Sequence, residues 1–356
     1  MGLHIAMRLT KRGVSTVAVA VIVVVIVVAS VGTYAYFTYY GTGKPKTPLI
    51  IYTADLYTRE ASYLYSGFSN STGVPYAAPN GGGSNALATQ ISQGAPVSVF
   101  ISVAKSTLGS ADLGTQYSGW GIAFAADQMT LGYTSAAGQP SEFQQILNAY
   151  QAASSSNSTA DWKAFFTDLV SGSVRVGISN PNTDPAGFRG WLVLEAAGAR
   201  YAGNSSYFTD MLLQSKSNFT ASSASDLVAP LQAGQIQFLF MYKSAAISDH
   251  VQALNLPNQV NLGDPALSSF YAQFSYQTTS GLQTGGPIYL YVTVPRNSTE
   301  TTYALQLVVY IVQHSSDMSQ FGMVPLSPAK LYNSTEVPAP IAQLLTSGAL
   351  VESGTV

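Results

Sequence analysis

The sequence predicts an α/β fold, in which strands and helices alternate along the chain from residue 49 onward. Short apolar runs rich in Val, Ile, Phe and Tyr are typical of buried strands, and most are followed by segments with apolar residues at helical spacing. Strands separated by helices imply parallel βαβ units. One stretch departs from this alternation, because residues 14–31 are apolar almost without interruption.

The strands and helices follow from these patterns in order. We expect strands at residues 49–54, 97–103, 121–134 (with a break), 173–178, 236–242 and 287–295. We expect helices at residues 58–68, 140–153, 160–170, 185–197, 206–216, 224–233 and 300–314. A further helix follows the glycine turn at residues 81–83 and is capped near Ser84 or Asn85.

Composition excludes several classes of function. The formal charge is −2 with 9 % charged residues, so a nucleic-acid partner is not expected. The chain has no cysteine and three histidines, which leaves no thiolate nucleophile and little material for a metal cluster. It also lacks the G-x-S-x-G, H-E-x-x-H and P-loop motifs. We therefore expect neither an enzyme nor a bound cofactor.

The N-terminus carries a targeting signal. Residues 1–13 form a basic leader, residues 14–35 are long and apolar enough to cross a bilayer, and residues 36–48 form a polar linker. The basic flank would stay cytoplasmic and leave the main domain outside the cell. The stretch "KRGVSTVAVAV" admits two interpretations: an ordinary signal anchor or signal peptide, or a signal that resembles the class III, pilin-like signals of archaea, cleaved after Gly13.

Glycosylation motifs agree with an extracellular location. The pattern Asn-x-Ser/Thr marks acceptors in surface loops. It occurs at Asn70, Asn157, Asn204, Asn218, Asn297 and Asn333.

Several loops carry the donors that a small anion needs. Ligands of open α/β sheets bind outside the carboxyl ends of strands, near helix N-termini. Loops rich in hydroxyls, amides or glycines lie at residues 52–58, 81–85, 102–106, 179–187 and 242–244. In "GISNPNTDPAGFRG" (residues 177–190), Asp184 and Pro185 are typical of an N-cap and a first helical residue. A helix start offers free N–H groups and a positive dipole end, which suit an oxyanion.

Three blocks resemble a known family. They are "WGIAFAADQMTLGYT" (120–134), "VRVGISNPNTDPAGFRG" (174–190) and "LQAGQIQFLFMYKSAA" (231–246). They are similar to archaeal tungstate/molybdate-binding proteins, the extracytoplasmic receptors of ABC importers, over about residues 49–328.

The resemblance implies a two-lobed, type II periplasmic-binding-protein fold with a hinge of two strands. Lobe I would comprise residues 49–131 and 287–356, and lobe II residues 132–286. It also implies that the chain hands tungstate or molybdate to an ABC permease and its ATPase.

The resemblance assigns roles to single residues. Ser84 matches an oxyanion donor, Asp184 a carboxylate that reaches the metal of the anion, and Tyr242 an aromatic residue near the ligand. Each also has a structural interpretation, as a helix cap for Ser84 and Asp184 and as a core-edge tyrosine for Tyr242, and Arg189 is expected to brace its loop. The expected oxyanion site comprises Asp55, Gly83, Ser84, Asn85, Ser102, Asp184, Pro185, Ala186 and Tyr242.

Two positions depart from the family pattern. Ala54 and Asp55 replace a Gly-Ser pair, and the Asp55 carboxylate would repel an oxyanion unless Arg59 pairs with it. Ala224 stands where the family has its second metal-reaching acid. We therefore expect a tetrahedral oxyanion with Asp184 mainly capping its helix. Sulfate or phosphate remains an alternative ligand, and a ligand-free, pilin-like envelope subunit remains an alternative function.

Overall fold

The computed structural model describes residues 48–135 and 139–356. The fold described below belongs to the unit Pro45–Val356. The predicted leader and anchor lie outside the described residues, as does all but the last residue of the predicted linker. In the part of the chain that is described, none of the helices has the length and apolar character needed to cross a bilayer.

A seven-stranded sheet forms the centre of one half of this unit. Its strands, in spatial order, are β14 (Leu350–Glu352), β13 (Val324–Asn333), β4 (Trp120–Asp127), β12 (Ile288–Thr293), β3 (Val99–Ser102), β1 (Ile51–Ala54) and β2 (Asn80–Gly82). The first three strands along the chain are parallel, but β12 runs antiparallel to β3 and β4. The prediction of purely parallel units was therefore wrong for this sheet, because β12 enters it from the other half of the molecule.

Helices cover both faces of this sheet. They are α2 (Thr58–Thr72), α3 (Ser84–Ser92), α4 (Ser110–Leu113), α13 (Thr301–Gln313) and α14 (Ala339–Thr346). Along β3, Val99 and Ile101 join one buried cluster while Phe100 joins another, as the two-residue period of a strand requires. Because both faces are buried at the centre of the sheet, β3, β4 and β12 are mainly apolar instead of alternating with polar residues.

A five-stranded sheet forms the centre of the other half. Its strands, in spatial order, are β7 (Asn218–Phe219), β6 (Val176–Gly177), β8 (Phe238–Tyr242), β5 (Met129–Tyr133) and β9 (Gln252–Asn255). Its helices are α5 (Ser141–Ser156), α6 (Thr159–Val170), α7 (Pro185–Ala197), α8 (Tyr207–Ser215), α9 (Val228–Gln232), α10 (Lys243–Ser248), α11 (Asn258–Asn261) and α12 (Ser268–Tyr271). A hairpin of β10 (Ser275–Thr278) and β11 (Gly281–Thr284) lies apart from both sheets.

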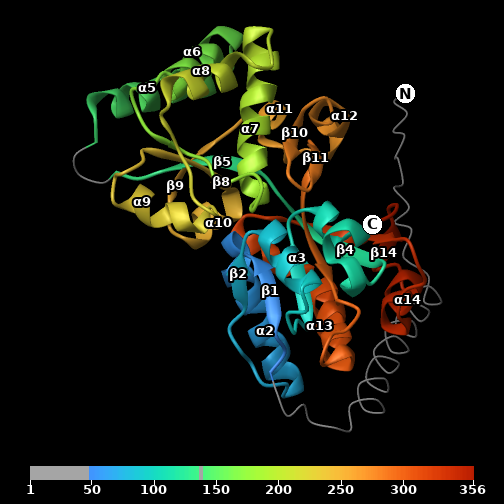
Figure 1. The fold of residues 1–356 in the computed structure, drawn as a ribbon. Coiled ribbons are helices and arrows are strands. Elements are labelled where there is room, and N and C mark those ends of the chain that lie inside the picture. The colour runs from blue at the N-terminus through green and yellow to red at the C-terminus, as the bar shows by residue number, and fades with distance from the viewer. Residues whose placement is uncertain (1–47, 136–138) are drawn as a thin grey trace, which may run out of the picture. The chain divides into compact units, whose positions relative to one another are not determined.

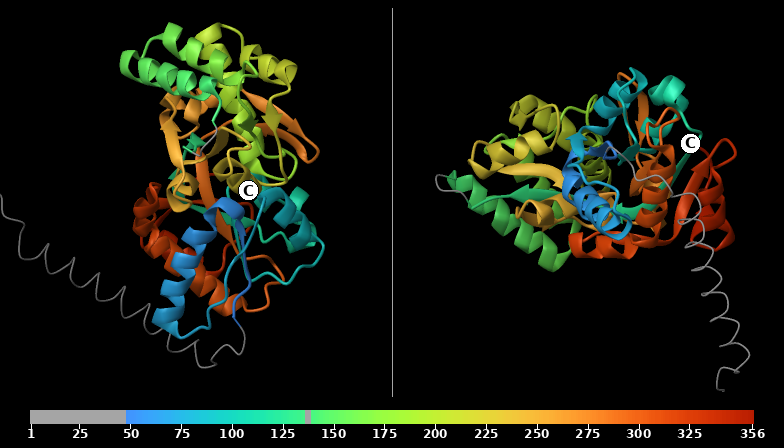
Figure 2. Two further views of the ribbon diagram at one scale, coloured as in Figure 1. Left: turned by 90° about the vertical axis from the view of Figure 1, so that its left-hand side faces the viewer. Right: turned by 90° about the horizontal axis from the view of Figure 1, so that it is seen from below.

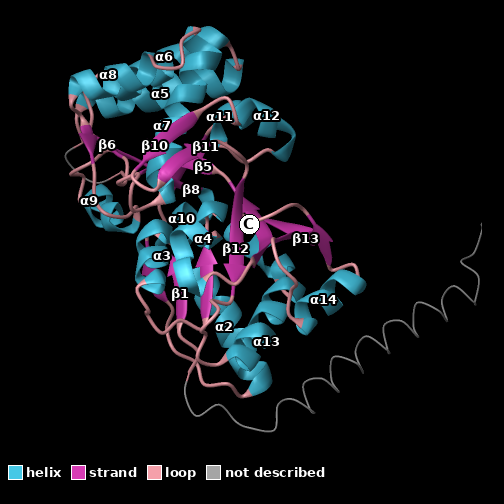
Figure 3. Cartoon of the chain, turned by 45° about the vertical axis from the view of Figure 1, so that its right-hand side comes forward, coloured by secondary structure: helices cyan, strands magenta, loops and turns pink. Residues whose placement is uncertain are grey.

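The figures show the two halves as separate bodies. Helices α5, α6 and α8 lie side by side on the outer side of the smaller sheet (Figures 1 and 3). The N-terminus of helix α7 points toward the half that contains the larger sheet (Figure 1). The two halves are also distinct when the molecule is turned by 90° about the vertical axis (Figure 2). Below, lobe I denotes the seven-stranded sheet with its helices, and lobe II denotes the five-stranded sheet with its helices and the hairpin. The residue limits expected from the sequence stay a prediction.

Two segments connect the sheets. The apolar run expected as one broken strand is two strands in different sheets, β4 and β5, which meet at Gln128. The chain returns through Gly285, Gly286 and Pro287, between β11 and β12. The two halves are therefore joined at Gln128 and at residues 285–287.

Other elements differ from the sequence prediction. Part of the expected glycine turn is the short edge strand β2, and the expected helix at 224–233 begins with a 3₁₀ turn, Ser225–Leu227. Strands β9 to β11, β13 and β14 and helix α14 were not predicted. Of the six glycosylation motifs, Asn70, Asn157, Asn204 and Asn297 are exposed, and Asn218 and Asn333 are half-buried.

Candidate functional site

The start of α7 is built by Asp184 and Pro185. The Asp184 side chain caps the helix, because its Oδ1 accepts a hydrogen bond from the backbone N–H of Ala186 at 3.0 Å. Gly187 lets the helix start close to the preceding loop, since a Cβ there would lie 2.2 Å from the carbonyl oxygen of Ser179. The sequence prediction that Asp184 is an N-cap is confirmed.

The starts of α3 and α7 touch across the two lobes. A Cβ on Gly83 would lie 2.2 Å from the carbonyl oxygen of Thr183, so the backbones are in direct contact there. The Asn85 side chain donates to the carbonyl oxygen of Asn182 at 3.5 Å. The cap of α3 is Gly83, so the expected cap at Ser84 or Asn85 was wrong. Ser84 is instead the first helical residue, and its buried hydroxyl accepts a long hydrogen bond from the Val103 amide at 3.4 Å.

Two buried carboxylates from opposite lobes meet beside this contact. Asp184 Oδ2 accepts from the amide of Ala224 at 2.8 Å. Asp55 Oδ2 accepts from the next amide, that of Ser225, at 3.1 Å. Burial, and after it the nearby charge of Asp55, together raise the pKa of Asp184 to about 7, although the hydrogen bonds from the amides oppose the shift.

Arg59 does not neutralise Asp55. It pairs with Asp249 at 3.4 Å and its side chain is half exposed. The pairing that would offset the charge of Asp55 is therefore not formed. Asp55 precedes α2 and is 8 % exposed. Its carboxylate accepts hydrogen bonds from backbone amides, including that of its neighbour Leu56.

Arg189 connects the lobes through its guanidinium. It donates to the Tyr242 hydroxyl at 2.7 Å and to the Val103 carbonyl oxygen, in lobe I, at 2.6 Å. The Tyr242 ring packs on Tyr57 of lobe I with ring centroids 5.3 Å apart. Burial raises the pKa of the Tyr242 hydroxyl well above its usual value, so this group is a neutral hydrogen-bonding phenol. These hydrogen bonds go to β8 and to lobe I, whereas the sequence analysis expected Arg189 to brace its own loop.

Two further acids at the lobe boundary were not predicted. Asp127, where β4 leaves lobe I, accepts from the hydroxyls of Tyr57 and Ser244. Glu60 of α2 accepts from the Ser248 hydroxyl of α10 at 2.9 Å. Burial raises the pKa of Asp127 to about 6 and that of Glu60 to about 7. An acid that ends an apolar strand, as in "WGIAFAAD", is the one sequence signal that could have identified Asp127.

The structure brings together most of the expected oxyanion site. Asp55, Ser84, Asp184 and Tyr242 are nearly completely buried, with exposed fractions of 8 %, 0 %, 2 % and 1 %. The Ser102 hydroxyl instead bonds to Thr107 at 2.6 Å within lobe I, so it does not face the others. Among the residues with described positions, no group of three His, Cys, Asp or Glu side chains could hold a metal ion.

The backbone donors of the site are bonded to carboxylates of the protein itself. The amides of Ala186, Ala224 and Ser225 all donate to Asp184 or Asp55. The Ser179 hydroxyl is buried next to Asp184 and has no hydrogen-bond partner of normal geometry among the described residues. The site therefore combines converging N–H groups, negative oxygens and a free hydroxyl.

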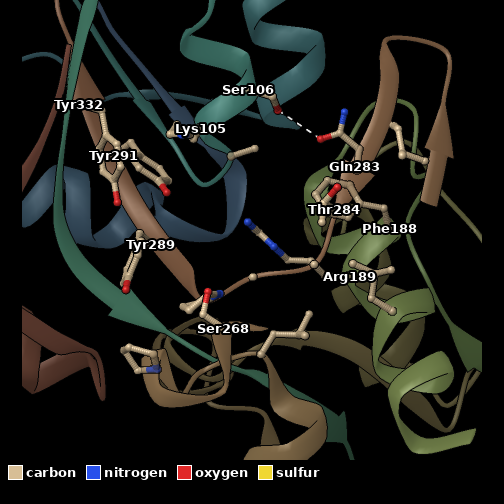
Figure 4. A pocket seen from close by; sticks show the side chains of 18 of the residues that line it. Lys105, Ser106, Phe188, Arg189, Ser268, Gln283, Thr284, Tyr289, Tyr291 and Tyr332 are labelled. Carbon is tan, nitrogen blue, oxygen red and sulfur yellow. Dashed lines mark hydrogen bonds between the residues drawn. The ribbon is translucent and has the colours of Figure 1, made fainter. Parts of the chain in front are cut away.

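A cavity of about 530 Å³ lies next to Arg189 at the lobe boundary. Figure 4 shows Arg189 reaching from α7 toward the side that carries Lys105 and the tyrosines of lobe I. No Asp or Glu among the described residues lines this cavity.

Comparison with known sequences identifies close relatives. A family model described as "Bacterial extracellular solute-binding protein" matches residues 63–316. An uncharacterised solute-binding protein of Saccharolobus solfataricus is 35 % identical over 314 residues, which cover 86 % of this chain and 78 % of the relative. One from Sulfurisphaera tokodaii is 36 % identical over 316 residues, covering 86 % and 83 %.

Solved structures share the fold. The periplasmic molybdate-binding protein of Azotobacter vinelandii aligns with a TM-score of 0.54 and 18 % identity, over 78 % of this chain and 98 % of that one. A sulfate-binding protein of Mycobacterium tuberculosis aligns with a TM-score of 0.50 and 14 % identity, over 86 % and 93 %. At these identities the likeness shows the two-sheet periplasmic-binding-protein fold and nothing finer.

Proposed function

This chain belongs to the family of bacterial extracellular solute-binding proteins, and we propose that it captures a tungstate- or molybdate-like oxyanion between its two lobes. Solute-binding proteins deliver their ligands to ABC transporters and are not enzymes. We propose an ABC permease with its ATPase as the partner, and a membrane anchor at residues 14–35. A molybdate-binding and a sulfate-binding protein share the fold, so the fold accommodates tetrahedral oxyanions.

One observation carries this proposal: backbone amides from lobe II converge on carboxylate oxygens contributed by both lobes. The amides of Ala224 and Ser225 bond to Asp184 and Asp55 respectively. The oxygens of an oxyanion are acceptors of the same charge and similar hydrogen-bonding geometry, so they suit the same N–H groups. The unpaired Ser179 hydroxyl would supply a further donor.

Protonation of Asp184 would remove one of the two carboxylate charges that repel an oxyanion at this site. Because burial raises its pKa to about 7, this carboxyl takes up a proton near neutral pH and can then donate to an oxyanion oxygen. The oxyanion stays tetrahedral in this arrangement, with Asp184 as cap and donor. In the alternative mode of binding, the metal of the anion would be six-coordinate. It would then take the carboxylates of Asp184 and Asp55 as two further ligands. The alanine at position 224 argues against this mode, because it replaces the second carboxylate of the family. Asp55 weakens that argument, because it accepts from the amide next to the one that donates to Asp184 and so supplies a second carboxylate there.

A second function is favoured by the same contacts. Asp184 and Asp55 already satisfy these amides, and the hydrogen bond from the Ser225 amide to Asp55 connects lobe II to lobe I. An envelope subunit that reuses the fold and binds nothing would have such contacts.

Calorimetric titration of the full-length chain in detergent distinguishes the two functions. Tungstate, molybdate, sulfate and phosphate would be titrated separately, with melting curves and small-angle scattering at saturation. We expect saturable binding of at least one oxyanion, a higher melting temperature and a smaller radius of gyration. If millimolar concentrations of all four anions produce no heat, no thermal shift and no compaction, the envelope subunit is the better interpretation.

A further inference from the structure

The cavity beside Arg189 is built from both lobes. Lobe I contributes the loop after β3 and tyrosines of β12 and β13, and lobe II contributes the second and third turns of α7. The crossing segment around Gly285 and the hairpin strand β11 complete the wall. A ligand held here would contact both lobes and one of the two hinge segments.

The charge of the wall is of one sign. Lys105, Arg189 and Lys330 line the cavity, and no Asp or Glu among the described residues does. The Lys105 amine donates to the carbonyl oxygen of Thr355 at 3.0 Å and lies 4.9 Å above the Tyr332 ring. A concave, partly apolar wall with charges of one sign focuses the potential and attracts counter-ions.

Lys330 is held in the same way. Its amine donates to the Tyr289 hydroxyl at 3.3 Å and lies 5.0 Å above the ring of that tyrosine. Neutral groups therefore position both lysines, and their positive charge remains for a ligand.

Arg189 has donors left for a ligand in the cavity. A guanidinium carries five N–H groups. Among the described residues its bonds are those to Tyr242 and Val103. Figure 4 shows the guanidinium between the two sides of the cavity, so its remaining N–H groups are positioned for an anion there.

The size and lining of the cavity exclude a bare oxyanion as the natural occupant. A volume of about 530 Å³ falls within the range of sites that hold small organic molecules. Leu192, Leu262, Leu282 and Phe188 provide apolar walls that a tetrahedral oxyanion would not use. Tyrosine, serine and threonine hydroxyls provide neutral donors and acceptors between the charges.

We propose that this cavity binds a small organic anion, with a carboxylate or phosphate group on an apolar or hydroxylated body, at a second site of the protein. Asp55, Ser84, Asp184 and Tyr242 do not line it, so it is separate from the oxyanion site proposed above. Arg189 borders both sites. An anion that bonds to Arg189 and Lys105 together contacts both lobes and stabilises their closed arrangement.

Titration of the full-length chain with three probes tests the proposal. Citrate carries carboxylates, glucose 6-phosphate carries a phosphate, and uncharged glucose is the control. We expect citrate or glucose 6-phosphate to bind saturably and glucose not to bind. Lys330→Met and Lys105→Met should each weaken binding by about tenfold, the effect of one charged hydrogen bond.

A matched variant controls for the loss of a lysine. Lys163 lies over the Tyr207 ring of lobe II at 5.1 Å, outside the cavity lining, so Lys163→Met should leave binding unchanged. Lys330→Arg keeps the positive charge. If Lys330→Met weakens binding because it removes that charge, Lys330→Arg should retain most of the wild-type affinity. Melting curves show whether each variant is folded.

Three results would overturn the proposal. They are the absence of binding by both anions, equal binding of glucose, and affinities unchanged by Lys330→Met and Lys105→Met. Competition between molybdate and the organic anion for one stoichiometric site would overturn the claim that the sites are separate. A lack of molybdate binding alone contradicts the oxyanion function and leaves the second site standing.

Discussion

Asp55 of lobe I and Asp184 of lobe II bond to the backbone amides of two consecutive residues. The Ala224 amide donates to Asp184 at 2.8 Å, and the next amide donates to Asp55 at 3.1 Å. Burial, and after it the neighbouring charge of Asp55, raise the pKa of Asp184 to about 7. The lobes therefore meet at a pair of acids in which the charge of Asp184 depends on pH near neutrality.

Asp184→Asn separates the two modes of oxyanion binding. The variant keeps an N-cap and removes a charge, so we expect oxyanion affinity at pH 7 to be unchanged or higher. In the wild type, sulfate binding should strengthen as pH falls from about 8 to about 6, because a carboxyl with raised pKa becomes protonated there. The variant should lose most of this pH dependence.

Calorimetry with sulfate and tungstate at several pH values measures both effects. Asp226→Asn is the control, because Asp226 is exposed and lies near the site without facing Asp184. A severe loss of affinity in Asp184→Asn, larger for tungstate than for sulfate, would support the six-coordinate mode and refute ours. An X-ray absorption spectrum of the tungstate complex that shows six oxygen neighbours around the metal, two of them from protein, would also refute our mode.

Glu60→Gln should flatten the dependence of stability on pH. Burial raises the pKa of Glu60 in the folded chain to about 7, from about 4.5 in the unfolded chain. Between these values the folded state holds the proton that the unfolded state releases, so stability falls as pH rises through this window. The loss from this residue is at most about 3 kcal/mol and is complete above the folded pKa.

Chemical denaturation from pH 4 to pH 8 measures this slope. The Gln side chain stays neutral and still accepts from Ser248, so the variant should be the more stable protein at pH 8. Glu336→Gln, at an exposed position, changes the net charge equally and should keep the wild-type slope. Parallel slopes in wild type and Glu60→Gln would show that Glu60 does not retain its proton.

Gly83→Ala should hinder lobe closure. The added Cβ would lie 2.2 Å from the Thr183 carbonyl oxygen, and backbone on both sides leaves little room to yield. We expect a larger radius of gyration and at least tenfold weaker oxyanion binding. Unchanged scattering in Gly83→Ala would show that the lobes close without this contact.

Arg189→Lys should weaken the connection between the lobes. A lysine cannot reach the Tyr242 hydroxyl and the Val103 carbonyl oxygen with one planar group. We expect a loss of about 1–3 kcal/mol in the free energy of unfolding, as for a buried charged hydrogen bond. Arg200→Lys, on the exposed surface, should change it by less than about 0.5 kcal/mol. Equal effects of both substitutions would contradict the role of Arg189.

Processing of the N-terminus distinguishes the two targeting signals. If the class III interpretation is correct, mass spectrometry of the native protein will find a mature chain that starts at Val14 and retains the apolar run. A start near Thr38 or later would show that the run is removed. Retention of Met1 would indicate an ordinary signal anchor.

Local chemistry determined much of the fold from the sequence alone. Asp184 and Pro185 predicted the start of α7, because a cap bonds to the amide two residues ahead of it. The apolar run at β8 predicted a buried strand for an equally local reason. The family resemblance, not the local pattern, assigned Ser84, Asp184 and Tyr242 to one site, and that site stays a prediction although all three residues are buried.

Contacts between distant residues were decided only by the tertiary structure. Residues 121–134 are apolar on both sides of Gln128, so the sequence does not show that β4 and β5 belong to different sheets. The partner of Asp55 is an amide 170 residues away, whereas the sequence suggested Arg59, one turn further along. Helix caps and strand periodicity depend on neighbours within a few residues. The charge state of a buried acid depends instead on which lobe packs against it, and that is known only once the chain has folded.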